Sequence, residues 1–65
     1  MREVTHNIAA ALPAASAVFA SRGLDGTRIN DIVEATGIPR PTLYYHFSSK
    51  EEILAWLLER LLRDL

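Results

Sequence analysis

Apolar residues recur along the first third of the chain at intervals of three and four. Ile8 is followed by Leu12, Ala15, Val18 and Phe19. This spacing places the apolar side chains on one face of an α-helix. The pattern therefore predicts an amphipathic first helix.

Local signals indicate where this helix ends but not where it begins. Arg22 followed by Gly23 is typical of a C-terminus, because glycine adopts a positive φ without a Cβ clash and a cation suits the negative end of the helix dipole. Pro13 removes a backbone donor near the start. Two possibilities stay open: a straight helix begins near Pro13, or an earlier turn meets it at a kink.

A loop and a short second helix are expected next. Residues 24–28 are predicted to form the loop, with Asp25-Gly26 as its turn and Thr27 as the N-cap of the following helix. Gly37 is expected to end that helix. Its inward face is predicted to consist of Ile29, Ile32, Val33 and Thr36.

The third helix is predicted over Pro39–Phe47. Both Pro39 and Pro41 then lie in the first turn, where no intrahelical donor is needed, and Leu43 and Phe47 face inward, four positions apart. Two short helices joined by a three-residue turn are typical of a helix-turn-helix, whose second helix enters the DNA major groove. The alternative on pattern alone is an ordinary helical hairpin whose glycine only caps a helix.

A fourth helix is predicted from the two serines to the end of the chain. A capping box can form from Ser48 with Glu51 or from Ser49 with Glu52. The apolar stripe of this helix is wider than a small three-helix unit can cover. It consists of Ile53, Leu54, Leu57, Leu58, Leu61, Leu62 and Leu65.

The length limits the chain to one small domain, and the helical patterns predict an all-α fold with a helix-turn-helix. The 65 residues include no cysteine, which excludes disulfides and thiolate metal sites. The longest apolar runs, Ile8–Ala15 and Ile53–Leu58, are far shorter than the roughly 20 residues of a membrane span. We therefore expect a cytoplasmic protein with no membrane partner.

An enzyme is not expected. His6 and His46 lie forty positions apart, and no cysteine is available to complete a metal site with them. Ser48 and His46 are close in sequence without an acid to orient them, so a hydrolase triad is not supported. No cofactor is indicated.

Charge distribution favours DNA binding despite a formal net charge of −1. No acidic residue lies between Ala35 and Lys50. The donors to phosphate in this segment are Arg40, Thr42, Tyr44, Tyr45, His46 and Lys50.

Three segments carry a resemblance to a known family: residues 23–27 (GLDGT), 32–38 (IVEATGI) and 42–51 (TLYYHFSSKE). The last is the most specific. With them, Ala14–Leu54 resembles the N-terminal DNA-binding domain of the TetR family of bacterial transcriptional regulators. The resemblance implies a three-helix bundle with a helix-turn-helix plus a fourth, linking helix. It also implies homodimers that bind palindromic double-stranded DNA as repressors and are released by a small molecule, which would bind a domain not present here. We therefore expect residues 1–65 to be the N-terminal part of a longer protein.

The resemblance also implies which residues bind DNA. The recognition helix falls on Pro39–Phe47, where Arg40, Pro41, Thr42 and Tyr44 would contact base edges or phosphates, flanked by Tyr45 and His46. Lys50, Thr27 and Arg28 would contact phosphates at the starts of the fourth and second helices. A second class of function stays open: a small helical interaction module that binds a protein through the Leu54–Leu65 stripe.

Overall fold

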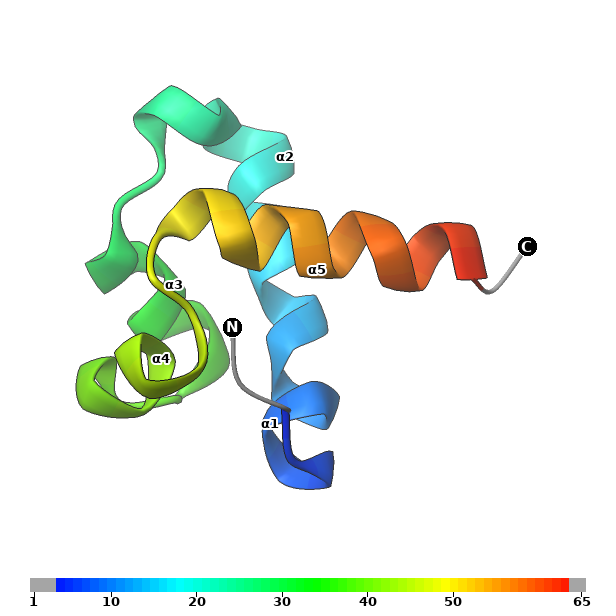
Figure 1. Cartoon of the computed structure of the whole chain (residues 1–65). Helices are drawn as coiled ribbons and strands as arrows, with labels where there is room; N and C mark the ends of the chain where they lie inside the picture. The colour runs from blue at the N-terminus through cyan, green and yellow to red at the C-terminus, as the bar shows by residue number, and fades with distance from the viewer. Residues whose placement is uncertain (1–3, 64–65) are drawn as a thin grey trace.

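The computed structural model describes residues 4–63, and all regular structure within that range is helical. This confirms the all-α prediction. Figure 1 shows the helices in chain order. Their bounds are α1 His6–Ala11, η1 Leu12–Ala14, α2 Ala15–Gly26, α3 Ile29–Thr36, α4 Arg40–His46 and α5 Lys50–Arg63.

The predicted first helix is a bent rod made of α1, η1 and α2 (Figure 1). Thr5 caps its start by accepting a 3.4 Å hydrogen bond from the Ile8 N–H at its hydroxyl. Pro13 lies in the 3-10 turn η1, whose tighter winding separates the two α-helical parts. The second of the two possibilities is therefore the one observed: an earlier helical turn precedes Pro13.

Gly23 interrupts this rod as predicted, but the loop after it is shorter than predicted. Its φ of 75° and ψ of 168° change the chain direction, and one more helical turn runs to Gly26. Only Thr27 and Arg28 are left as a connection to α3. The expectation of a loop over residues 24–28 was wrong for its first three residues.

Thr27 does not cap α3, contrary to the sequence prediction. Its hydroxyl donates a 2.6 Å hydrogen bond back to the Gly23 carbonyl oxygen, and the residue is buried. The N-cap is Arg28, whose backbone N–H donates to the Asp31 carboxylate at 3.0 Å. The Thr27 hydroxyl is thus already used to close the turn that precedes α3.

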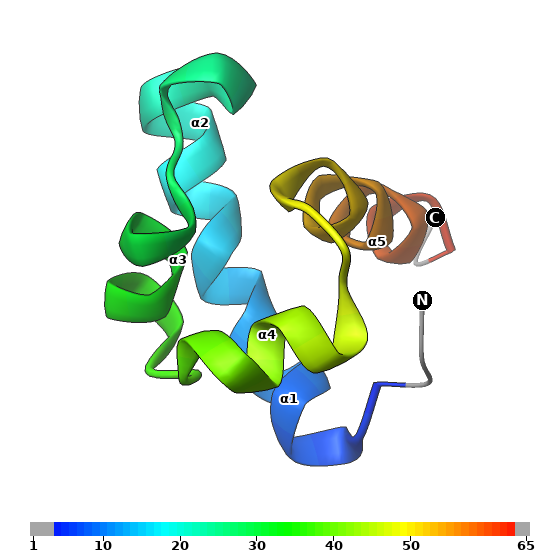
Figure 2. The ribbon, with the colours of Figure 1, turned by 60° about the vertical axis from the view of Figure 1, so that its left-hand side comes forward.

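The helix-turn-helix is formed by α3 and α4. Gly37 has φ 75° and ψ 5°, in the left-handed region, and its N–H donates to the Val33 carbonyl oxygen at 2.8 Å. Pro39 is the N-cap of α4, and Pro41 lies in the first turn as predicted. Figure 2 shows α4 running across the end of α3.

The predicted capping box of Ser49 with Glu52 is half formed at the start of α5, because its second hydrogen bond comes from Ser48 instead of Ser49. The Glu52 N–H donates to the Ser49 hydroxyl at 3.4 Å, and the Glu52 carboxylate accepts from the backbone N–H of Ser48. Hydrogen bonds from the Ser48 side chain and then its backbone lower the pKa of the Glu52 carboxyl below its ordinary value.

The core joins η1, α2, the helix-turn-helix and the first half of α5. Its buried side chains are Leu12, Ala15, Phe19, Ile32, Ile38, Leu43, Phe47 and Ile53. The outer half of α5 extends beyond this core (Figure 1), and there Leu58, Leu61 and Leu62 are exposed. This agrees with the predicted excess width of the apolar stripe, whose last member, Leu65, lies outside the described residues. Across residues 4–63, every helix is too short or too polar to cross a membrane.

Candidate nucleic-acid interface

Helix α4 has one buried and one exposed face. Leu43 and Phe47, one helical turn apart, are each 1% exposed and hold the helix against the core. Tyr44 and Tyr45 are 50% and 60% exposed. The helix therefore presents aromatic hydroxyl groups to the surroundings while its own position is determined by apolar contacts.

Arg40 begins α4 and is linked to α3. Its Nη2 donates a 3.2 Å hydrogen bond to Oδ1 of Asn30, and both side chains are exposed. Pro41 beside it is exposed, and Thr42 is half-buried. A guanidinium at the first turn of this helix is able to make bidentate contacts with a guanine or a phosphate.

The start of α5 is linked to the start of α3. The Lys50 ammonium donates a 3.0 Å hydrogen bond to the backbone carbonyl oxygen of Thr27. Arg28, the next residue, is exposed. These contacts and the Arg40–Asn30 bond place Arg28, Arg40 and Lys50 around the N-terminal half of α3, where the helix dipole also favours an anion.

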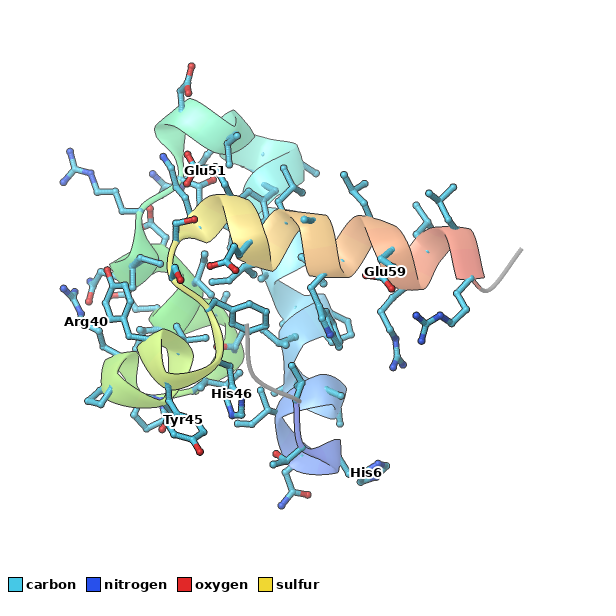
Figure 3. All side chains as sticks on the ribbon, viewed as in Figure 1. His6, Arg40, Tyr45, His46, Glu51 and Glu59 are labelled. Atoms are coloured by element: carbon cyan, nitrogen blue, oxygen red, sulfur yellow. The ribbon has the colours of Figure 1, made fainter. Side chains whose placement is uncertain are left out.

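Two of the nine predicted site residues, Thr27 and His46, are buried. Thr27 is 1% exposed and His46 4% exposed. Figure 3 shows His46 on the side of α4 that faces the rest of the molecule, whereas Tyr45 points away from it. The His46 ring packs edge-on against Tyr45 with centroids 5.0 Å apart, and its buried Nδ1 has no hydrogen-bond partner among residues 4–63. Neither side chain is therefore exposed at the surface of the molecule.

Asn30 is a surface residue that the sequence analysis did not select. Its contact with Arg40 joins residues ten positions apart on different helices. No local pattern marks it, because the contact depends on how α4 crosses α3.

A second, apolar surface lies between α2 and α5. It is an open groove of about 520 Å³. Phe19 and Leu24 line one side, and Leu54 and Leu61 line the other. The Arg60 guanidinium lies over the Trp56 ring, 5.2 Å from its centroid. The groove has few polar groups, and no group of three or more His, Cys, Asp or Glu able to hold a metal is found between residues 4 and 63.

Comparison with known proteins identifies the family. The family model described as "Bacterial regulatory proteins, tetR family" matches residues 11–57. The HTH-type transcriptional repressor KstR2 of Mycobacterium tuberculosis is 49% identical over 47 residues, which are 72% of this chain and 24% of the relative. KstR2 of Rhodococcus jostii is 44% identical over 54 residues, 83% of this chain and 26% of the relative.

A transcriptional activator is also among the relatives. The HTH-type transcriptional activator FasR of Mycolicibacterium smegmatis is 43% identical over 49 residues, 75% of this chain and 22% of the relative. The chain spans about a quarter of the length of these curated relatives. No solved structure matches the chain.

The matched residues run from the last residue of α1 to the middle of α5 and so include the whole helix-turn-helix. They make up more than half of the 65 residues. The chain therefore belongs to the tetR family of bacterial regulatory proteins and carries the DNA-binding helix-turn-helix of a transcriptional regulator.

Proposed function

We propose that this chain reads a DNA operator with the exposed face of α4 and holds the DNA backbone with the starts of α3 and α5. The observation that carries the proposal is the placement of Arg40, fixed to α3 at the first turn of a helix whose outer face is exposed. Such a helix fits the major groove with its N-terminal residues toward the base edges.

The proposed contacts divide into two kinds. Arg40, Pro41, Thr42 and Tyr44 would face base edges or nearby phosphates from α4. Lys50 and Arg28 would contact phosphates beside α3, and Tyr45 would contact the backbone from the end of α4. Backbone contacts of this kind place the protein on the duplex, and base contacts supply sequence preference.

Thr27 and His46 receive a different role from the one the resemblance implied. Because both side chains are buried, we assign them support of the surface rather than direct contact with DNA. Thr27 supplies the carbonyl oxygen that accepts from Lys50. His46 supports Tyr45 through ring packing.

The operator is proposed to be palindromic and bound by two copies. A single recognition helix reads only a few base pairs, and two symmetry-related helices in successive major grooves lie about 34 to 36 Å apart. The chain spans a quarter of its relatives, so we place the dimerisation and inducer-binding parts outside these residues. The exposed Leu58, Leu61 and Leu62 would pack against that part.

Repression is the proposed outcome of binding. Support comes from the names of relatives: the KstR2 proteins are called transcriptional repressors, and IcaR of Staphylococcus epidermidis is called a negative transcriptional regulator. Release by a small molecule, action in the bacterial cytoplasm and the absence of catalysis belong to the same proposal. No residue of the site is assigned a catalytic role.

The test is a selection of bound sequences from a random duplex pool, followed by titration of the selected duplex. The 65-residue chain and a version dimerised through a C-terminal fusion are compared at several salt concentrations. We expect a palindromic site, affinity that falls steeply with salt, and much tighter binding by the dimer. The proposal is wrong if neither protein binds duplex DNA in a salt-dependent way, or if the monomer binds a half-site as tightly as the dimer binds the palindrome.

A further inference from the structure

Asn30 contacts Arg40 from the neighbouring helix. It is the second residue of α3, and its Oδ1 accepts the 3.2 Å hydrogen bond from Nη2 of Arg40, the first residue of α4. A guanidinium has only donors, so the Asn30 amide must turn its oxygen toward Arg40. The amide NH₂ group then points away from the arginine.

Asn30 is itself held by a fixed segment. Beside it, the Asp31 carboxylate accepts from the Arg28 N–H and so secures the first turn of α3. Two residues along the chain, Ile32 is fully buried in the core. An arginine is long and has many rotamers, so a bond to a side chain on this fixed helical turn restricts the directions in which its other donors point.

The chemistry of the two side chains suggests how they act together. The Arg40 guanidinium carries five N–H donors in a planar fork, and the bond to Asn30 uses one of its nitrogens. The remaining donors are sufficient to bind both O6 and N7 of a guanine, the most common specific arginine contact in the major groove. The direction of these donors depends on the nitrogen that Asn30 holds.

We infer that Asn30 is a positioning residue that determines sequence preference through Arg40, selecting a guanine at the base pair that Arg40 faces. This inference rests on the proposed function, because it requires α4 to lie in the major groove. Asn30 and Arg40 form one reading unit made from two helices. A change at Asn30 therefore alters the preference at the base pair read by Arg40 and not at others.

The experiment is a double-mutant cycle on binding preference. Asn30→Ala, Arg40→Ala and the double variant, each in the dimerised full chain, are used to select sequences from a random duplex pool. Affinities are then measured for the preferred duplex and for duplexes changed at each single base pair. Asn7→Ala is the matched control, since Asn7 is exposed on α1, which is not part of the helix-turn-helix. Thermal melting of every variant reports on folding.

We expect Arg40→Ala to lower discrimination at its base pair by about 5- to 150-fold, the range for loss of a bidentate contact. Asn30→Ala is expected to lower it at the same base pair by at least about threefold, within the range for loss of one typical hydrogen bond. In the Arg40→Ala background, Asn30→Ala should change nothing further. Asn7→Ala should leave all preferences intact.

Each other outcome overturns the inference. Unchanged preference in Asn30→Ala removes the positioning role, and an equal loss on every duplex assigns Asn30 to phosphate binding. A base-specific effect that persists in the Arg40→Ala background means that Asn30 reads DNA itself. If only the melting midpoint changes, Asn30 is structural. The failure of the proposed function looks different: wild type itself would show no salt-dependent binding to any duplex.

Discussion

The Lys50 ammonium and the Thr27 carbonyl oxygen form a 3.0 Å hydrogen bond across 23 positions of sequence. The bond joins the first residue of α5 to the short connection before α3. The Thr27 hydroxyl donates to the Gly23 carbonyl oxygen at 2.6 Å, so this connection is held from both sides. A cation is thereby fixed between the N-terminal ends of two helices, where an anion is attracted by both dipoles.

Replacing Lys50 with methionine should weaken binding to all DNA sequences by a similar factor. The substitution keeps most of the apolar stem but removes the charge, so the slope of log affinity against log salt should become shallower by about 1. Loss of the bond to Thr27 should also lower the unfolding free energy by about 1 kcal/mol. Titrations at several salt concentrations measure the first effect, and denaturant melts the second. Lys50→Arg, which keeps the charge, is the control, and a loss confined to one sequence would contradict the phosphate assignment.

Arg40→Ala should relax sequence preference at one or two base pairs. A bidentate contact between arginine and guanine contributes about 1 to 3 kcal/mol of discrimination. Competition between the selected duplex and random DNA measures the change. Equal loss of affinity for both would show that Arg40 contacts a phosphate.

Gly37→Val should destabilise the fold by about 1 to 2 kcal/mol, because a β-branched residue does not tolerate the left-handed region. The cost comes from the φ of 75° and not from crowding, since a Cβ at this position would meet no atom within 4 Å. Thermal melting measures it.

The matched control is Gly26→Ala, at a glycine without a positive φ, where the new Cβ would lie 3.6 Å from that of Arg22. This variant should melt close to wild type. An unchanged midpoint in Gly37→Val would mean that the turn conformation of Gly37 does not limit stability.

Stability should fall on acidification in a way that depends on Glu52. Hydrogen bonds from Ser48 lower the pKa of this carboxyl in the folded protein relative to the unfolded chain. The hydrogen bonds to the Glu52 carboxylate therefore contribute their full stabilisation at pH values above the unfolded-state pKa of about 4.5. This contribution is lost as the pH falls through the lower pKa of the folded protein. Melting midpoints measured from neutral pH downward should decline less steeply for Glu52→Gln than for wild type.

Glu51→Gln is the control for this experiment. Glu51 is exposed in the same first turn of α5, so its replacement removes a similar charge without removing the bond to Ser48. It should retain the acid sensitivity of wild type. If both variants behave alike, the effect comes from net charge in the first turn and not from the cap.

The helix-turn-helix was predictable because its signals are local. The left-handed glycine at Gly37, Pro41 in the first turn of α4, and the four-residue spacing of Leu43 and Phe47 are as predicted, whereas Pro39 is the N-cap and not part of the first turn. Each depends on the conformation of one residue or on the period of one helix. The TetR-type resemblance rested on the same segment, and the family comparison confirms it.

The features that could not be predicted from the sequence depend on contacts between residues of different helices or turns. Thr27 was a reasonable N-cap by residue type, but its hydroxyl instead donates a hydrogen bond to the Gly23 carbonyl oxygen. The Asn30–Arg40 bond depends on the crossing of two helices. The burial of His46 did have a signal, because within the predicted third helix residues 43, 46 and 47 follow the spacing of one helical face.

The separation of the two faces of α4 has a consequence for the evolution of operator choice. Leu43 and Phe47 hold the helix, while Arg40 and Tyr44 lie outside the core. Outer positions are therefore free to change and acquire a new operator without loss of the fold, since surface substitutions typically alter stability by no more than about 0.5 kcal/mol. Under the inference above, the two positions are coupled: while Arg40 reads its base pair, a change at Asn30 alters the preference, and once Arg40 is replaced Asn30 is also free to change.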